Sequence, residues 1–272
     1  MSKLFSTASI LFGAFLAAST LSAQTARVKV IHNCADPAAD TVDVWLDNTL
    51  LLDNFAFRTS SAFVDAPAGT PVTIGVAPSN STMASQALEQ VTTTLTDGET
   101  YIITASGNLG SGFTPTTAFS LEVRADARET AAVATNTDIL VLHGSTDAPT
   151  VDVRTQDLAT TLVDDLSYPQ YSSYLEVPTG DMVISLTGST GTLIQRYSAP
   201  LATLSLTGAA ITVVASGYLD PSVNNNGEAF GLWVATAAAG NMLELPLFVE
   251  ASVVDLRSAD FALNLFPMPA NT

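Results

Sequence analysis

Apolar and polar residues alternate along several short runs of this chain. The pattern is clearest over residues 28–30, 42–47 and 72–76, and it returns over 211–215. These runs are rich in Val, Ile and Thr, and Gly, Pro, Asn or Asp stand at their ends. A period of two is typical of a β-strand with one buried face. The chain from Gln24 onward is therefore predicted to be all-β.

The runs belong to a repeat, because similar segments recur at a nearly constant separation along the chain. His32 matches His143, and Asp36 matches Asp147 at the same separation. One further pair of matching segments departs from this separation by two residues, a change in length that a turn tolerates. The matched segments are VKVIHNCADP (28–37) with ILVLHGSTDA (139–148), TVDV (41–44) with TVDV (150–153), and AFSLEV (118–123) with AFGLWV (229–234).

Each copy of about 110 residues has enough short strands for an antiparallel, immunoglobulin-like β-sandwich. The expected domains are residues 24–137 and 138–245, followed by a linker over 246–272. The connection between the copies, around residues 131–137, is short and uncharged. The two copies are therefore expected to lie close together.

The N-terminus is typical of a signal peptide over residues 1–23. Lys3 is the only charge there, an apolar stretch runs from Ile10 to Ala18, and Ala23 precedes the expected cleavage site. This stretch is too short to span a bilayer, and no later segment is long and apolar enough. We therefore expect export. The single cysteine, Cys34, cannot form a disulfide within its own chain.

Composition narrows the choice of partners. With 47% hydrophobic and 13% charged residues the chain can bury a core, and its net charge of -17 repels phosphate backbones and anionic membranes. Nucleic acid is therefore excluded as an expected partner, which leaves a protein or a glycan.

One segment of the second copy resembles a known family. HGSTDAPTVDV at 143–153 is similar to the signature of the bacterial family called domain of unknown function 4397, and Tyr174, Pro178, Gly180 and the Ser-Gly pair at 216–217 fit its later motifs. The resemblance implies an exported or surface-attached β domain, often in tandem, with no established activity. The matching positions are His32, Asp36, Asp43, Gly69, His143, Asp147, Asp152 and Gly180.

The resemblance covers about residues 27–245, although the first copy has Cys34 in place of Ser and a longer turn at 36–40. The C-terminal LNLFPMPANT (263–272) resembles the start of a type IX secretion sorting domain, with Met268 where Asn is usual. That resemblance implies a location outside a Gram-negative cell.

The two histidines allow two hypotheses. Each stands at the end of a strand, and an Asp (Asp36 or Asp147) follows four residues later, so the pair could act as a general base with its orienting carboxylate. Alternatively, each imidazole bonds a backbone group or Asp of its own copy and supports the fold. Duplication favours the second hypothesis. A Cys34–His32 nucleophilic pair lacks a recognisable oxyanion loop, so no catalysis is predicted.

Metal binding has one candidate set. Two histidines and one cysteine do not make a zinc site. Calcium prefers carboxylate oxygens, although Asp is also a common turn residue. The calcium candidates are Asp36, Asp40, Asp43, Asp147 and Asp152. No other cofactor is expected.

Three further residues carry expectations. Trp45 shares a strand face with Asp43 and Asp47, which predicts an exposed aromatic and a contact for a sugar. Gly69 and Gly180 each follow a proline by two residues, which predicts a positive φ or a tight turn.

The sequence thus predicts a secreted or cell-surface protein that is structural or binds a partner without catalysis. A carbohydrate-binding module is the alternative, and a hydrolase is the third hypothesis.

Overall fold

The alternating runs form β-strands in a computed structural model, which describes residues 23–250. Within these residues there is no α-helix, and none of their segments is a helix long and apolar enough to cross a membrane. Three short 3-10 turns occur, η1 (Pro37–Ala39), η2 (Ala84–Gln86) and η3 (Pro221–Val223). The predicted signal peptide, apart from its last residue, and the segment at 263–272 lie outside the described residues.

The strands of the first copy are β1 (Thr25–His32), β2 (Thr41–Leu46), β3 (Thr49–Ala56), β4 (Thr59–Ser60), β5 (Val64–Pro67), β6 (Pro71–Pro78), β7 (Glu89–Thr94), β8 (Thr100–Ser106) and β9 (Ser120–Arg124). Those of the second copy are β10 (Asn136–His143), β11 (Val151–Thr155), β12 (Thr161–Leu166), β13 (Leu175–Pro178), β14 (Asp181–Gly188), β15 (Leu193–Pro200), β16 (Ala210–Ser216), β17 (Gly231–Ala235), β18 (Gly240–Asn241) and β19 (Leu243–Glu244).

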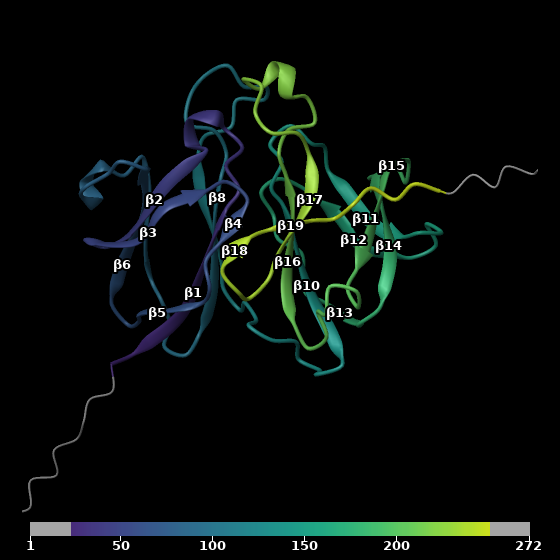
Figure 1. Ribbon diagram of the computed structural model, residues 1–272, viewed down its shortest axis with the longest axis horizontal. Helices are drawn as coiled ribbons and strands as arrows, with labels where there is room; N and C mark the ends of the chain where they lie inside the picture. The colour runs from purple at the N-terminus through teal and green to yellow at the C-terminus, as the bar shows by residue number, and fades with distance from the viewer. Residues whose placement is uncertain (1–22, 251–272) are drawn as a thin grey trace, which may run out of the picture.

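The two copies form two sandwiches side by side (Figure 1). Each has an outer sheet, in the order β3-β2-β6-β7 or β12-β11-β14-β15. The inner sheets have the orders β4-β1-β8-β9 and β13-β10-β16-β17-β19. The all-β prediction of two sandwiches is confirmed, and each inner sheet adds one parallel pair, β1 with β8 or β10 with β16.

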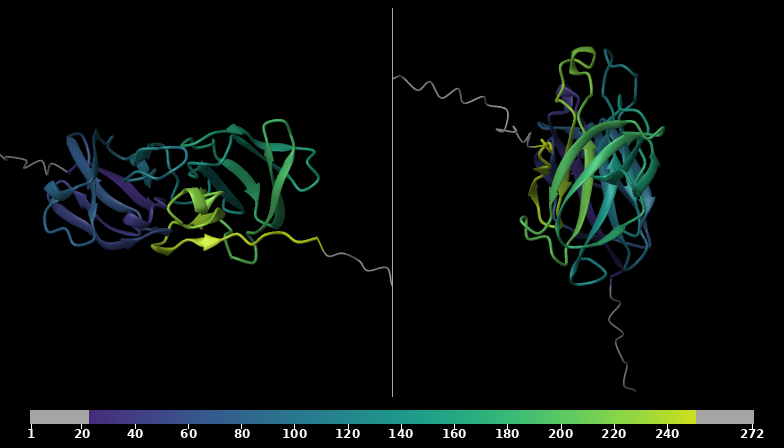
Figure 2. Two further views of the ribbon diagram at one scale, coloured as in Figure 1. Left: turned by 90° about the horizontal axis from the view of Figure 1, so that it is seen from above. Right: turned by 90° about the vertical axis from the view of Figure 1, so that its right-hand side faces the viewer.

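The inner sheets are buried on both faces, because each packs against its own outer sheet and against the other copy (Figure 2). On β1, Val28 and Val30 enter the first core while Ile31 faces the second copy. On β10, Val141 enters the second core while Leu142 faces the first copy. The contact between the copies, called the inter-copy interface below, consists of Ile31, Phe63, Ile102, Ala127, Leu140, Leu142, Val214, Ala235 and Met242.

Polar contacts across this interface join matched positions of the repeat. The Asn33 amide donates to the Gly144 carbonyl at 2.8 Å, and Gly144 is the match of Asn33. The Tyr218 hydroxyl donates to the side chain of Asn108, which stands at the matched place in the loop of the first copy. Contacts between equivalent positions are the mark of an isologous interface, so the copies are related by an approximate two-fold axis.

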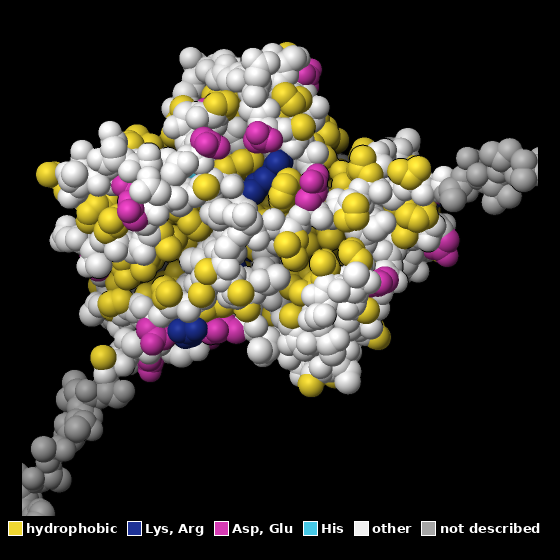
Figure 3. All heavy atoms as spheres, viewed as in Figure 1, with side chains coloured by type: hydrophobic (Ala, Val, Ile, Leu, Met, Phe, Trp, Pro, Cys, Tyr) yellow, Lys and Arg dark blue, Asp and Glu magenta, His cyan; other side chains and the backbone are white. Residues whose placement is uncertain are grey.

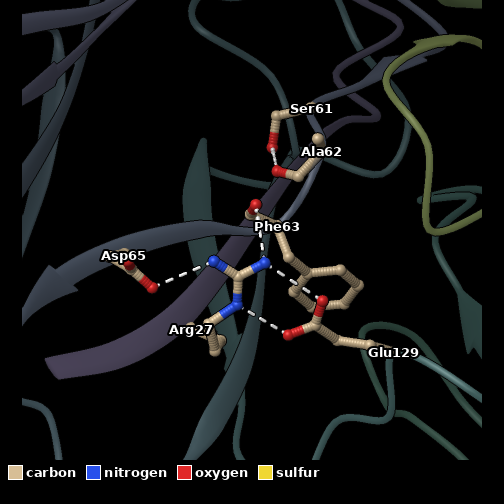
Figure 4. Close-up of polar contacts among 6 residues, drawn as sticks. All are labelled: Arg27, Ser61, Ala62, Phe63, Asp65 and Glu129. Carbon is tan, nitrogen blue, oxygen red and sulfur yellow. Dashed lines mark hydrogen bonds and ion pairs between the residues drawn. The ribbon is translucent and has the colours of Figure 1, made fainter.

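The connection between the copies is held to both of them. Arg128 pairs with Asp138 at 2.5 Å in the second copy. Its neighbour Glu129 pairs with Arg27 of the first copy at 2.7 Å, and Arg27 also reaches Asp65 (Figure 4). Adjacent residues of one segment thus bond to opposite copies.

The C-terminal part of the second copy crosses in the other direction. Strand β18 pairs with β4 of the first copy, and β19 then pairs with β17 of its own copy. Between these strands, Met242 is buried in the inter-copy interface. The segment therefore covers one side of the junction between the copies (Figure 1).

The two cores are filled to different extents. The second encloses an apolar cavity of about 60 Å³ that Leu166 and Ile211 line. At the matched positions the first core carries the larger Phe55 and Tyr101. The cavity therefore follows from smaller side chains at equivalent places.

We expect Leu166→Phe to stabilise the protein by about 0.5–1 kcal/mol, because the added ring atoms fill existing space. The matched change Phe55→Leu should cost about 1 kcal/mol, since it opens a comparable cavity in the first core. Urea unfolding of both variants measures the two free energies. A Leu166→Phe protein less stable than wild type would show that the cavity cannot accept a ring.

Candidate functional site

The sequence motifs of both copies meet at one end of the molecule. Strands β1 and β10 end there with His32 and His143. The loops after β8 and β16, residues 107–119 and 217–230, project side by side from this end (Figure 1). We call them the paired loops.

Direct contacts join the paired loops. The rings of Phe113 and Tyr218 stack with centroids 5.9 Å apart. The backbone N–H of Thr114 donates to the Asn224 side chain at 2.9 Å. The two copies thus present one continuous surface at this end.

The histidines support the turns below the loops. His32 Nε2 lies 2.7 Å from the Ala39 carbonyl, and His143 Nε2 lies 2.9 Å from the Pro149 carbonyl. A carbonyl can only accept, so each ring donates its Nε2–H. Both rings are buried, which lowers the pKa of His32 to about 4 and also lowers that of His143. Neutral imidazoles in these places hold the backbone.

The aspartates that follow the histidines hold the loop bases and do not contact the rings. Asp36 accepts from the backbone N–H of Leu109 at 2.8 Å. Asp147 accepts from the backbone N–H groups of Leu219 and Asp220 at 2.9 and 3.0 Å. In both copies the carboxylate therefore fixes the start of one paired loop.

Asp43 and Asp152 stabilise equivalent irregularities in the outer sheets. Each accepts a backbone N–H, from Asn54 at 3.0 Å or from Asp165 at 2.9 Å. Both donors have a positive φ, 53° and 46°, where the strand register shifts. The Asp165 N–H also lowers the pKa of Asp152. Each carboxylate therefore stabilises a β-bulge in the outer sheet of its copy.

Cys34 and Ser145 make the same bond. The Cys34 thiol donates to the Gly107 carbonyl at 3.1 Å, and the Ser145 hydroxyl donates to the Gly217 carbonyl at 2.6 Å. A Cβ on Gly107 would lie 2.1 Å from the Ala118 carbonyl oxygen. Burial raises the pKa of Cys34 to about 12, so the thiol stays protonated at neutral pH.

The calcium candidates do not converge. Among residues 23–250 no three His, Cys, Asp or Glu side chains are grouped as metal ligands. Four of the candidates, Asp36, Asp43, Asp147 and Asp152, bond backbone N–H groups instead. The fifth, Asp40, is exposed at the end of η1.

The prediction of an exposed Trp45 is wrong. Its side chain is buried, with 7% exposure, and its Nε1–H donates to Ser81 Oγ at 2.9 Å. Ser81 also donates to Asp43, which lies on the same strand face. The connection from β6 to β7 therefore covers a face that the alternation alone assigned to solvent.

The two glycines meet the prediction in different ways, Gly69 through a positive φ and Gly180 through a tight turn of two residues. Gly69 has φ +75°, whereas Gly180 does not have a positive φ. A Cβ on Gly180 would lie 4.0 Å from its nearest atom. The reason lies in turn length. Three residues separate β5 from β6, but two separate β13 from β14.

Sequence reasoning missed Arg58. Its guanidinium lies between the rings of Phe57 and Trp233, 4.7 and 4.2 Å from their centroids. It donates to the Ala229 carbonyl at 2.6 Å and to that of Ser216 at 3.2 Å. The matched residue of the second copy is Pro169, so the repeat carried no signal for this contact.

A pocket of about 270 Å³ lies between the motif turn of the first copy and residues 226–228 of the second paired loop. Phe57 and the carboxylates of Asp36, Asp40 and Glu228 line it together with Asn226. The lining combines an aromatic ring with oxygen acceptors.

Together these contacts define a two-copy β-sandwich protein whose recurring polar residues hold turns and loops. The chain belongs to the family described as "Domain of unknown function (DUF4397)", which matches residues 26–154 and 137–229. No curated protein matches this chain. Among solved structures, the fimbrial anchor protein Mfa2 from Porphyromonas gingivalis aligns at 13% identity over 79% of this chain and 100% of that chain, with a TM-score of 0.18.

We expect the stability of the protein to fall as the pH drops from about 6.5 to about 4. The unfolded imidazole of His32 binds a proton near pH 6.5, while the buried ring binds one only near pH 4. Acid therefore favours the unfolded chain, by about 3 kcal/mol for this residue below pH 4. Urea unfolding between pH 4 and 7 measures the slope. An equally steep slope in His32→Gln would contradict this origin.

Cys34→Ser should leave stability within about 0.5 kcal/mol of wild type, because Ser145 makes the same bond in the second copy. Cys34→Ala should cost about 1 kcal/mol, since the buried Gly107 carbonyl loses its donor. Thermal unfolding of the two variants provides the comparison. Equal losses in both would show that the sulfur acts through its volume and not through its hydrogen bond.

Proposed function

We propose that this protein is an exported, non-catalytic interaction protein whose paired loops form the partner-binding surface. The observation that carries the proposal is the joining of the loops by the Phe113–Tyr218 stack, directly above the motif residues. A stable fold alone does not need two loops held in one geometry. A rigid, composite surface is suited to recognition.

The motif chemistry supports an assignment without catalysis. His32 and His143 are buried and donate to backbone carbonyls, and the Cys34 thiol is protonated at neutral pH. A general base needs an accessible ring near its substrate. Hydrolase activity that disappears in His32→Ala would contradict the assignment.

The exposed character of the loops supports protein or glycan partners. Leu219 and Val223 are exposed at 48% and 46% on the second loop. In Figure 3 the upper end of the molecule, where the loops lie, carries few charged side chains. The proposal includes a location outside a Gram-negative cell, either secreted or on the surface, because the sequence predicts a signal peptide.

A carbohydrate-binding module is the second candidate, because of the pocket between the motif turn of the first copy and the second paired loop. Phe57 supplies a ring, and Asp40, Asn226 and Glu228 supply acceptors for sugar hydroxyls. The buried Trp45 no longer supports it.

We expect the double variant Leu219→Ser and Val223→Ser to lower binding of the purified protein to whole bacterial cells at least five-fold. A matched control makes the same kind of change far from the loops, at Leu193 and Ile194, which are exposed at 39% and 46%. The control should bind as wild type, as measured by flow cytometry. Equal binding by both variants would contradict a role for the loops. Selective glycan-array binding lost in Asp40→Asn would favour the carbohydrate module.

A further inference from the structure

The approximate two-fold axis relates two grooves between the copies. One groove is filled by the chain itself and the other is open. Beside β17, the groove is filled by the chain itself, because β19 pairs with the outer edge of β17 and β18 pairs with β4. Strand β9 is the match of β17 in the first copy. Within residues 23–250, the outer edge of β9 has no paired strand.

The opposite wall of this second groove is equally unpaired. In the filled groove, the backbone of Ser60 pairs with Ile31 on one side and with Gly240 on the other. Its match, Tyr171, forms an antiparallel bridge with Leu142, which is the match of Ile31. In the described part of the chain, no backbone hydrogen bond reaches the N–H or C=O of Tyr171. Both walls therefore offer strand edges that no backbone of residues 23–250 pairs with.

The space between these walls is a groove of about 660 Å³. Val123 and Arg124 of β9 line one side, and residues 169–173 line the other. Tyr171 is fixed there, because its hydroxyl bonds Thr104 at 2.6 Å across the inter-copy interface. The groove is thus built from elements that other contacts hold in place.

Arg124 gives the open groove its own chemistry. In the filled groove the matched residue is Ala235, which belongs to the same apolar cluster as Met242. Among residues 23–250, Arg124 Nε is buried without a hydrogen-bond partner, and no ion pair there includes this side chain. Arg124 is half-buried, and its shielded Nε–H without an acceptor favours a carboxylate at this point.

We propose that this open groove binds an extended segment of a partner polypeptide, which adds as a strand beside β9 and places a carboxylate on Arg124. The chain already shows the packing mode, since its own residues 240–244 fill the equivalent groove. Strand addition supplies affinity through backbone bonds, and the side-chain contact supplies selectivity. Asp164 and Asp165 line the same groove, so the partner residues facing them are neutral or basic.

The groove is separate from the paired loops, so the two proposals can fail independently. The test uses the whole mature chain and a labelled peptide with the sequence of residues 239–245 in which Glu replaces Met242. Fluorescence anisotropy should show saturable binding that weakens at least ten-fold in Arg124→Gln. A peptide with Gln at the same place should bind as weakly. Arg196→Gln, a matched change on β15, should bind as wild type, and so should the loop double variant.

Backbone amide exchange identifies the occupant. The peptide should slow exchange at Tyr171 and at the outward-facing amides of β9, which do not bond to β8 and should exchange readily without it. Protection that grows with protein concentration would show a second copy of the chain in the groove. Concentration-independent protection without peptide would show a segment of the same chain there. Either result overturns the proposal, as does peptide binding that Arg124→Gln leaves unchanged.

Discussion

The apolar contact between the inner sheets is the constraint on which the rest of the structure depends. Strands β1 and β10 carry apolar residues on both faces, so neither can face water on its second side. Each copy covers that side of the other. The same contact brings the two motif ends together, creates both grooves and places the linker residues Arg128 and Glu129 between the copies.

Lys29 shows how this interface accommodates a charge. Its side chain is buried where the second copy has Leu140, and its amine donates to Ser60 Oγ at 3.0 Å and to the Ser61 and Ala238 carbonyls. Desolvation lowers the pKa of Lys29 to about 8. Because the Ala238 carbonyl lies on the crossing C-terminal segment, this amine also ties that segment to the first copy.

The repeated polar residues share one physical role. His32, Asp36, Asp43 and Cys34 and their counterparts satisfy backbone groups at turns, bulges and loop bases. Buried backbone groups without partners are costly, so each of these bonds favours one conformation of its turn. In the proposals made above, recognition uses positions that differ between the copies. Arg58 has Pro169 as its match in the repeat, and Arg124 has Ala235.

The sequence by itself determined the all-β class and the two copies, because strand alternation and a repeat with constant spacing are local or linear signals. It also identified His32, Asp36 and their matches as positions that matter to both copies. The tertiary structure decided the rest. Trp45 is buried because a distant connection covers it, and Gly180 lacks a positive φ because its turn is one residue shorter than that at Gly69. The paired loops, the Arg58 contact and the open groove beside β9 exist only between the copies. A one-dimensional pattern reports which face of a strand is apolar, but the partner that covers this face comes from residues far away in the chain.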